Sequence, residues 1–136
     1  MKPKHKKAYM KTAEVFAECS VGERLKVGAV IVKDNRIISC GYNAHAEHIG
    51  GPLEGPDGLT LPWVRHAEKS ALMGLLRAGI SPMGSSIFIT HSPCQLCAID
   101  LVDAGIKHVY YKNEYRDLTG VNYLRNNHIW VEHYVD

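Results

Sequence analysis

Apolar residues follow two distinct periods along the first third of the chain. They recur at helical spacing over residues 5–19 and form a nearly continuous run over residues 27–32. The first pattern predicts an amphipathic helix and the second a buried strand. Asp34 and Asn35 then predict a tight turn into a returning strand over residues 36–40, so we expect the two strands to form a hairpin.

Six further elements are predicted between glycine, proline and polar residues. They are helices over residues 64–78, 93–104 and 117–126 and strands over residues 87–90, 109–111 and 129–134. Ser92 is the expected cap of the second of these helices, with Pro93 at its first position. The connection between the last two strands holds a helix, which predicts a parallel crossover. We therefore expect an α/β fold with three layers, α/β/α, around a five-stranded mixed sheet whose last two strands are parallel.

A long loop, rich in glycine and proline, separates the hairpin from the next helix. A loop of this length (residues 41–62) inside a small domain is usually functional or mobile. It contains the tripeptide His45-Ala46-Glu47, followed by His48. We interpret these histidines as part of a solvated or effector-binding loop, and a second metal site that uses His45 and His48 is the alternative.

The composition is that of an ordinary globular protein. The 136 residues, 46% of them hydrophobic, suit one domain over residues 1–136. No apolar run approaches the roughly 18 residues of a membrane span. The basic N-terminus predicts a solvated helix start and lacks the apolar stretch of a secretory signal, so we expect a cytoplasmic protein with no membrane partner. The net charge of +2 suits a small anionic substrate and does not demand nucleic acid.

Two short motifs carry the candidate chemistry: H-A-E at residues 66–68 and C-Q-L-C at residues 94–97. Cys94 and Cys97 share one face at a helix start, whose partial positive charge favours metal-binding thiolates. With His66 they make three zinc ligands, one short of a closed tetrahedron, and an open position is typical of catalytic zinc. Such a zinc ion lowers the pKa of its bound water. Glu68 is then the expected proton carrier between that water and a substrate.

Two other interpretations of these motifs stay open. A structural zinc with a fourth ligand elsewhere would use the same three residues but would leave Glu68 without a role. A redox pair would explain Cys94 and Cys97 alone, and the accompanying H-x-E motif disfavours it. The remaining cysteines, Cys19 and Cys40, are expected to be reduced and buried as small hydrophobic residues.

The combination H-x-E…P-C-x-x-C is typical of zinc-dependent nucleobase deaminases. From about residue 8 to residue 134, the chain resembles the deoxycytidylate (dCMP) deaminase family of the cytidine deaminase superfamily. The likeness rests on the segments at residues 27–32, 37–43, 66–68, 87–98, 104–111 and 115–117. Free cytidine deaminases differ in having Cys where His66 stands, and transfer-RNA adenosine deaminases usually have Glu where Ser92 stands.

This resemblance implies zinc-dependent hydrolytic deamination of dCMP to dUMP and ammonia, which supplies dUMP for thymidylate synthesis. It makes His66, Cys94 and Cys97 the ligands of Zn2+ and Glu68 the catalytic residue. The candidate substrate-binding residues are Asn43, Ala67, Arg24, Tyr115, Arg116 and Ser92. Arginine has the forked geometry that a phosphate group requires. The alternative for each arginine is a surface charge, and for Asn43 it is a turn residue.

The resemblance also implies a regulated homohexamer, activated by dCTP and inhibited by dTTP, with Mg2+ on the triphosphate effector. The expected effector-binding residues are Gly41, Tyr42, Asn43 and Ala44. Two alternatives from other classes stay open. One is a transfer-RNA adenosine deaminase or another deaminase of bases in nucleic acid. The other is a zinc-stabilised nucleotide-binding module that is not an enzyme.

Overall fold

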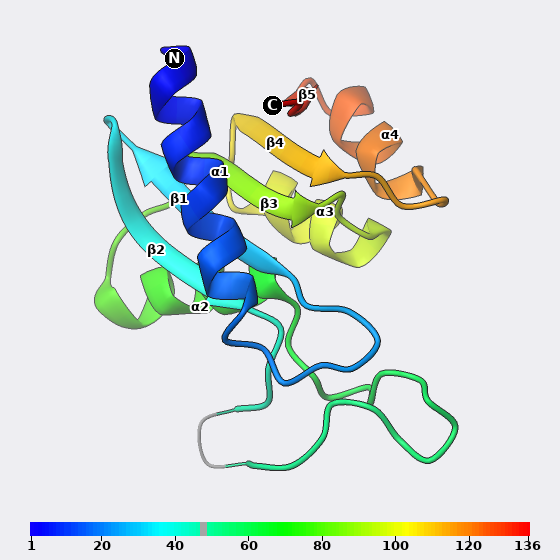
Figure 1. The fold of residues 1–136 in the computed structure, drawn as a ribbon. Helices are drawn as coiled ribbons and strands as arrows, with labels where there is room; N and C mark the ends of the chain where they lie inside the picture. The colour runs from blue at the N-terminus through cyan, green and yellow to red at the C-terminus, as the bar shows by residue number, and fades with distance from the viewer. Residues whose placement is uncertain (47–48) are drawn as a thin grey trace.

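The computed structural model describes residues 1–46 and 49–136 and contains the predicted alternation of helices and strands (Figure 1). In chain order the elements are α1 (Pro3–Ala17), β1 (Gly28–Lys33), β2 (Arg36–Tyr42), α2 (Ala67–Ala78), β3 (Ser86–His91), α3 (Gln95–Asp103), β4 (His108–Asn113), α4 (Thr119–Asn126) and β5 (Trp130–His133). This order confirms the predicted succession of elements, and most of the bounds differ from the predicted ones by only a few residues.

The five strands form one sheet in the order β2-β1-β3-β4-β5. Strand β1 is antiparallel to both of its neighbours, whereas β3, β4 and β5 are parallel. Asp34 and Asn35 join β1 to β2 with φ angles of 51° and 59°, as a two-residue hairpin turn requires. The predicted mixed sheet with parallel last strands is therefore confirmed.

Helices cover both faces of the sheet, with α1 across one face and α2 and α3 against the other (Figure 1). Alternate residues of a strand point to opposite faces. Val30 therefore packs in the cluster that includes Met10 of α1, and Ile31 packs in the cluster that α2, α3 and α4 share. Because both faces are covered, β1 is buried along most of its length, which explains its continuous apolar run.

Two glycines bring helix backbones directly against the hairpin. A Cβ atom on Gly28 would lie 1.8 Å from the carbonyl oxygen of Ala13 in α1. A Cβ atom on Gly41 would lie 2.4 Å from the carbonyl oxygen of Ala67, the first residue of α2. Gly41 was predicted as an effector-binding residue, which stays a prediction; in the structure its missing side chain lets the beginning of α2 lie close to β2.

Helix α2 begins at Ala67, three residues later than residue 64, where we expected it. The residue before the motif is extended because Arg65 pairs with Ala44: the Arg65 N–H donates to the Ala44 carbonyl at 2.9 Å, and the Ala44 N–H donates back at 3.1 Å. His66 consequently occupies the N-cap position in an extended conformation, with φ −70° and ψ 157°.

The predicted cap of helix α3 is also wrong. The N-cap is Cys94, not Ser92, and the helix begins at Gln95. Ser92 continues the strand pairing, because its N–H donates to the Asn113 carbonyl of β4 at 2.8 Å. Its hydroxyl accepts the backbone N–H of Tyr115 at 2.9 Å, so it fixes the segment after β4 and does not cap the helix.

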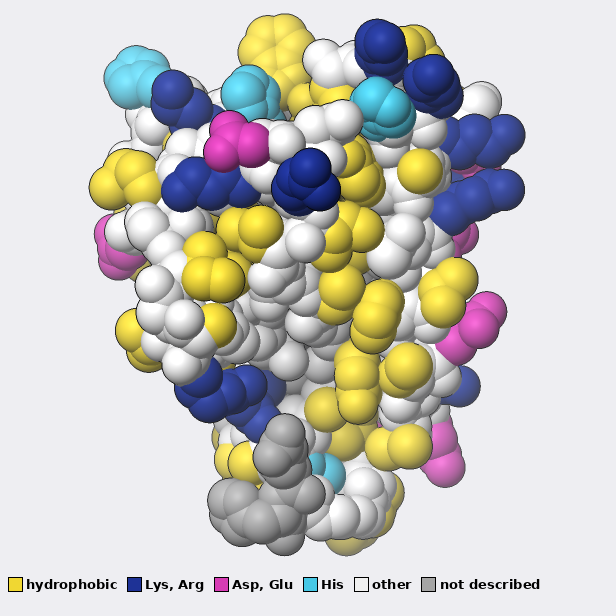
Figure 2. Space-filling view, turned by 90° about the vertical axis from the view of Figure 1, so that its left-hand side faces the viewer, with side chains coloured by type: hydrophobic (Ala, Val, Ile, Leu, Met, Phe, Trp, Pro, Cys, Tyr) yellow, Lys and Arg dark blue, Asp and Glu magenta, His cyan; other side chains and the backbone are white. Residues whose placement is uncertain are grey.

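On the face shown in Figure 2, lysine and arginine side chains gather mainly toward the end of the molecule that carries the N-terminus. Lys2, Lys4 and Lys7 are exposed, as expected of a solvated helix start. Lys6 pairs with Glu132 of β5 at 3.1 Å. Among the residues described, none of the helices combines the length and the apolar character that crossing a membrane requires.

All four cysteines are free thiols in the structure. Cys40 is half-buried in β2. Cys19 departs from its prediction, because α1 ends at Ala17 and leaves the Cys19 side chain exposed just beyond the helix.

Candidate active site

The ends of two helices bring three potential metal ligands together. His66 precedes α2, Cys94 precedes α3, and Cys97 lies in the first turn of α3. Their ligand atoms all lie within 4.8 Å of one another, with His66 Nδ1 at 3.2 Å from Cys97 Sγ and 3.6 Å from Cys94 Sγ. These separations match the edges, about 3.5 Å long, of a tetrahedron built from ordinary zinc–nitrogen and zinc–sulfur bonds.

This donor set fits zinc and leaves a position open. Thiolate and imidazole ligands suit Zn2+ better than they suit Mg2+ or Ca2+. Within the described ranges, no fourth His, Cys, Asp or Glu joins the group. Three protein ligands with one open position are the arrangement of catalytic rather than structural zinc. The predicted ligand triad is therefore assembled as the sequence indicated.

The two thiols of the triad differ in protonation in the metal-free chain. A hydrogen bond from Cys97 is the largest cause that lowers the pKa of Cys94, to about 4, and the interaction with His66 lowers it further. The same hydrogen bond raises the pKa of Cys97. The hydrogen bond with Cys94 also raises the pKa of His66. Metal binding at this triad would therefore release protons.

Glu68 lies beside the triad without belonging to it. It is the second residue of α2 and is only 4% exposed. Burial is the largest cause that raises its pKa, to about 7, in the metal-free chain. A buried carboxyl group that gains and loses a proton near neutral pH is suited to general acid–base chemistry. The position of Glu68 thus agrees with the predicted role of proton carrier.

A cavity of about 660 Å³ opens in front of the triad. It is lined by Arg24, Leu25, Val27, Asn43, Thr60, Val64, His66, Ala67, Glu68, His91, Ser92, Cys94, Tyr115, Arg116 and Asp117. This lining includes all six predicted substrate-binding residues. The sequence reasoning missed Leu25, Val27, Thr60, Val64 and Asp117. The predicted function of the long loop was the only signal for Thr60, and Val64 was expected to begin a helix that instead begins at Ala67.

One wall of the cavity is aromatic. The Tyr115 ring stacks on the His91 ring with 5.7 Å between centroids. Burial raises the pKa of Tyr115 to about 12, and the charge of Glu68 adds to this rise while Arg24 opposes it. Burial also lowers the pKa of His91, which favours a neutral imidazole in this wall. The phenol of Tyr115 therefore interacts electrostatically with both Glu68 and Arg24.

The side chain of Asn43 is hydrogen-bonded to the backbone just before β1. Its amide oxygen accepts the N–H of Val27 at 2.8 Å, and its amide nitrogen donates to the carbonyl of Leu25 at 2.8 Å. These bonds use one lone pair of the amide oxygen and one N–H, so the second N–H and the second lone pair remain for a ligand in the cavity. Contact between Asn43 and a substrate stays a prediction.

The predicted effector turn is held by strand-like contacts. Ala44 bridges Arg65, and of the four predicted effector residues only Asn43 is among the described residues that line the cavity. His45 Nε2 lies 2.8 Å from the carbonyl oxygen of Pro52. His48, the other residue of the alternative second metal site, lies outside the described residues.

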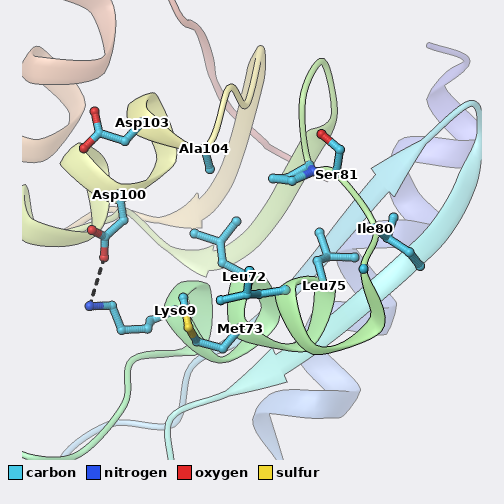
Figure 3. Close-up of a pocket in the computed structure, with 12 residues that line it drawn as sticks. Lys69, Leu72, Met73, Leu75, Ile80, Ser81, Asp100, Asp103 and Ala104 are labelled. Atoms are coloured by element: carbon cyan, nitrogen blue, oxygen red, sulfur yellow. Dashed lines mark ion pairs between the residues drawn. The ribbon is translucent and has the colours of Figure 1, made fainter.

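A second groove lies between α2 and α3, outside the cavity (Figure 3). Its apolar lining includes Leu72, Leu75 and Ile80. Lys69, the residue after Glu68, pairs with Asp100 of α3, with 3.3 Å between Nζ and Oδ2. Both side chains are partly exposed, so the pair contributes less than about 1 kcal/mol. It nevertheless joins the two helices that carry the metal ligands.

The chain matches a known protein family and is similar to several known proteins. Residues 3–113 match the family described as cytidine and deoxycytidylate deaminase zinc-binding region. The structure is similar to that of dCMP deaminase from the cyanophage S-TIM5 in complex with dCMP and dUMP, with a TM-score of 0.95, 43% identity, and coverage of 98% of this chain and 99% of that chain.

Two curated relatives extend the comparison. Deoxycytidylate deaminase of Mycobacterium phage D29 is 31% identical over 120 residues, which cover 78% of this chain and 92% of that protein. ComE operon protein 2 of Bacillus subtilis (strain 168) is 34% identical over 113 residues, which cover 79% of this chain and 59% of that protein. The match thus spans about three-fifths of the length of this second relative.

Proposed function

The chain belongs to the cytidine and deoxycytidylate deaminase family, whose members are zinc-dependent hydrolases, and from this premise we propose that it deaminates dCMP to dUMP and ammonia. The observation that carries the proposal is one cavity whose lining includes two of the three metal ligands, Glu68, and two arginines, Arg24 and Arg116. A metal centre for hydrolysis and cations for a phosphate group are the two features that a nucleoside monophosphate requires. The similar cyanophage enzyme was crystallised with dCMP and dUMP.

Deamination exchanges the amino group at C4 of the cytosine ring for the oxygen of water. Zinc held by His66, Cys94 and Cys97 would supply an activated water at neutral pH. Glu68 accepts a proton from the attacking water and delivers protons to the ring and to the departing amine, so that the C4–O bond forms and the C4–N bond breaks. Its buried carboxyl group, with a pKa of about 7 in the metal-free chain, suits both directions of transfer.

The beginning of α2 supplies a donor for the base. The first hydrogen bond of the helix runs from the Ser70 N–H to the His66 carbonyl at 2.9 Å. The N–H of Ala67 precedes this bond, so the helix itself does not use it. Because Ala67 lines the cavity, we assign its N–H to the O2 atom of cytosine. Asn43 would offer its second amide N–H to the sugar or the base.

We predict that Arg24→Gln and Arg116→Gln each raise the KM for dCMP by about 10-fold, because each removes a charge-assisted hydrogen bond to phosphate. The kinetics of deoxycytidine, which lacks the phosphate, should hardly change. Lys26→Gln is the matched control, since Lys26 is exposed in the same segment but is not among the described residues that line the cavity. Equal losses on dCMP and deoxycytidine would contradict phosphate binding.

We expect a substrate panel of dCMP, dCTP, cytidine and an anticodon stem-loop to give dCMP the highest kcat/KM. Ammonia release is measured for the first three, and inosine formation for the stem-loop. Preferred deamination of the stem-loop would instead support a transfer-RNA adenosine deaminase. A chain that contains zinc and deaminates none of these substrates would support the nucleotide-binding module.

Regulation and assembly are the finer parts of the proposal. By the resemblance, dCTP with Mg2+ activates the enzyme, dTTP inhibits it, and the protein is a homohexamer. The apolar groove between α2 and α3, beside the highly exposed Leu76, is a candidate contact between copies. Repeating the panel with each triphosphate, and measuring the mass of the assembly by sedimentation, tests these parts separately from catalysis.

A further inference from the structure

The Glu54 side chain links two walls of the cavity that are far apart in the sequence. Both of its carboxylate oxygens lie 3.2 Å from the backbone nitrogen of Glu23, and Oε2 also lies 3.2 Å from the backbone nitrogen of Arg24. Two successive N–H groups thus donate to one carboxylate, which is the arrangement of an anion-binding nest. Glu54 belongs to the long loop before α2, whereas Arg24 belongs to the segment between α1 and β1.

The backbone around Glu54 is itself anchored. Leu53 is 1% exposed, and its carbonyl accepts the N–H of Leu61 at 2.8 Å. Glu54 forms an isolated bridge with Thr60, which lines the cavity. The residue therefore pairs through its backbone with one wall and through its side chain with the other.

The segment that carries Arg24 is held from two sides. Asn43 binds its later part, through Leu25 and Val27. Glu54 binds its earlier part, through the amides of Glu23 and Arg24. Among the described residues no ion pair joins the side chains of Glu54 and Arg24, so the guanidinium group remains available to the cavity.

We propose that Glu54 is a positioning residue that holds the backbone of Arg24 so that its guanidinium group meets the phosphate of the substrate. The inference rests on the proposed function for the identity of that substrate. Glu54 does not line the cavity, so it acts through Arg24 and not by touching the nucleotide. A carboxylate suits this task because it accepts with both oxygens, and its charge strengthens the hydrogen bonds.

The first experiment measures kcat and KM of Glu54→Gln for dCMP and deoxycytidine. An amide keeps the shape but has one accepting oxygen and no charge. We expect the KM for dCMP to rise about 5-fold, as loss of about one net hydrogen bond implies, with kcat, zinc content and the kinetics of deoxycytidine unchanged. Asp57→Asn is the matched control, because the Asp57 carboxylate accepts the Leu59 N–H at 3.0 Å within the same loop.

The second measurement places Glu54→Gln in the Arg24→Gln background. If Glu54 acts through Arg24, the double variant should have the same KM for dCMP as Arg24→Gln alone. Effects on KM that multiply would overturn the proposal, as would an unchanged KM in the single variant or an equal loss on deoxycytidine.

A measurement that does not depend on deaminase activity tests this inference separately from the proposed function. Trypsin should cleave after Arg24 faster in Glu54→Gln than in the wild type or in Asp57→Asn, because the segment loses its earlier anchor. A wild type that does not deaminate dCMP overturns the proposed function, and equal cleavage rates overturn the anchoring by Glu54.

Discussion

Replacing Glu68 with glutamine is expected to lower kcat for dCMP by about 10³-fold, within the range of general acid–base contributions, while zinc stays bound as in the wild type. Glutamine keeps the size of the side chain but can neither accept a proton from water nor deliver one to the ring. Because Glu68 is not one of the three ligands, the metal site should remain intact. Ammonia release and the zinc content of the purified protein are measured on the same sample.

The matched control is Glu14→Gln on α1, which removes a carboxylate that pairs with Lys112, at 3.2 Å, outside the described cavity lining. It should leave kcat unchanged. Ammonia release by Glu68→Gln at the rate of the wild type would contradict the mechanism. A loss of zinc together with activity would show instead that Glu68 supports the metal site.

The fold was predictable because its signals are local and repeated. The apolar run of β1 and the Asp34-Asn35 turn determine the hairpin, and the helix before β5 determines the parallel crossover. The helix starts were less predictable because tertiary contacts override local preference. Ser92 is a good capping residue, yet its N–H and hydroxyl are used by Asn113 and Tyr115, which lie more than 20 positions away.

Some residues of the candidate site could likewise be predicted from the sequence, and others could not. The ligands and Glu68 follow from spacing, because two helix starts bring short motifs together. Thr60, Val64 and Glu54 depend on the path of the long loop, which no periodicity encodes. Asn43 shows the limit of residue type as a guide, because part of its amide is already used by the backbone before β1.

Replacing Cys97 with serine is expected to abolish stable zinc binding and, with it, all measurable deamination. Cys97 is 4% exposed and its thiol lies 3.2 Å from His66 Nδ1, so it connects the first turn of α3 to the beginning of α2. Serine is close in shape, but its hydroxyl is a far poorer zinc ligand than a thiolate. Two ligands would remain, which is fewer than any ordinary zinc site uses.

The same variant should lose the stabilisation that zinc gives to the folded state. Free zinc at about 1,000 times its dissociation constant stabilises a folded protein by about 4 kcal/mol if the unfolded chain does not bind it. The Tm of the wild type should therefore rise with zinc and fall with a chelator, whereas the Tm of Cys97→Ser should respond to neither. Cys19→Ala removes an exposed thiol outside the triad and should keep the zinc response of the wild type. A zinc-dependent Tm in Cys97→Ser would mean that the ion binds elsewhere, and the three-ligand centre would have to be abandoned.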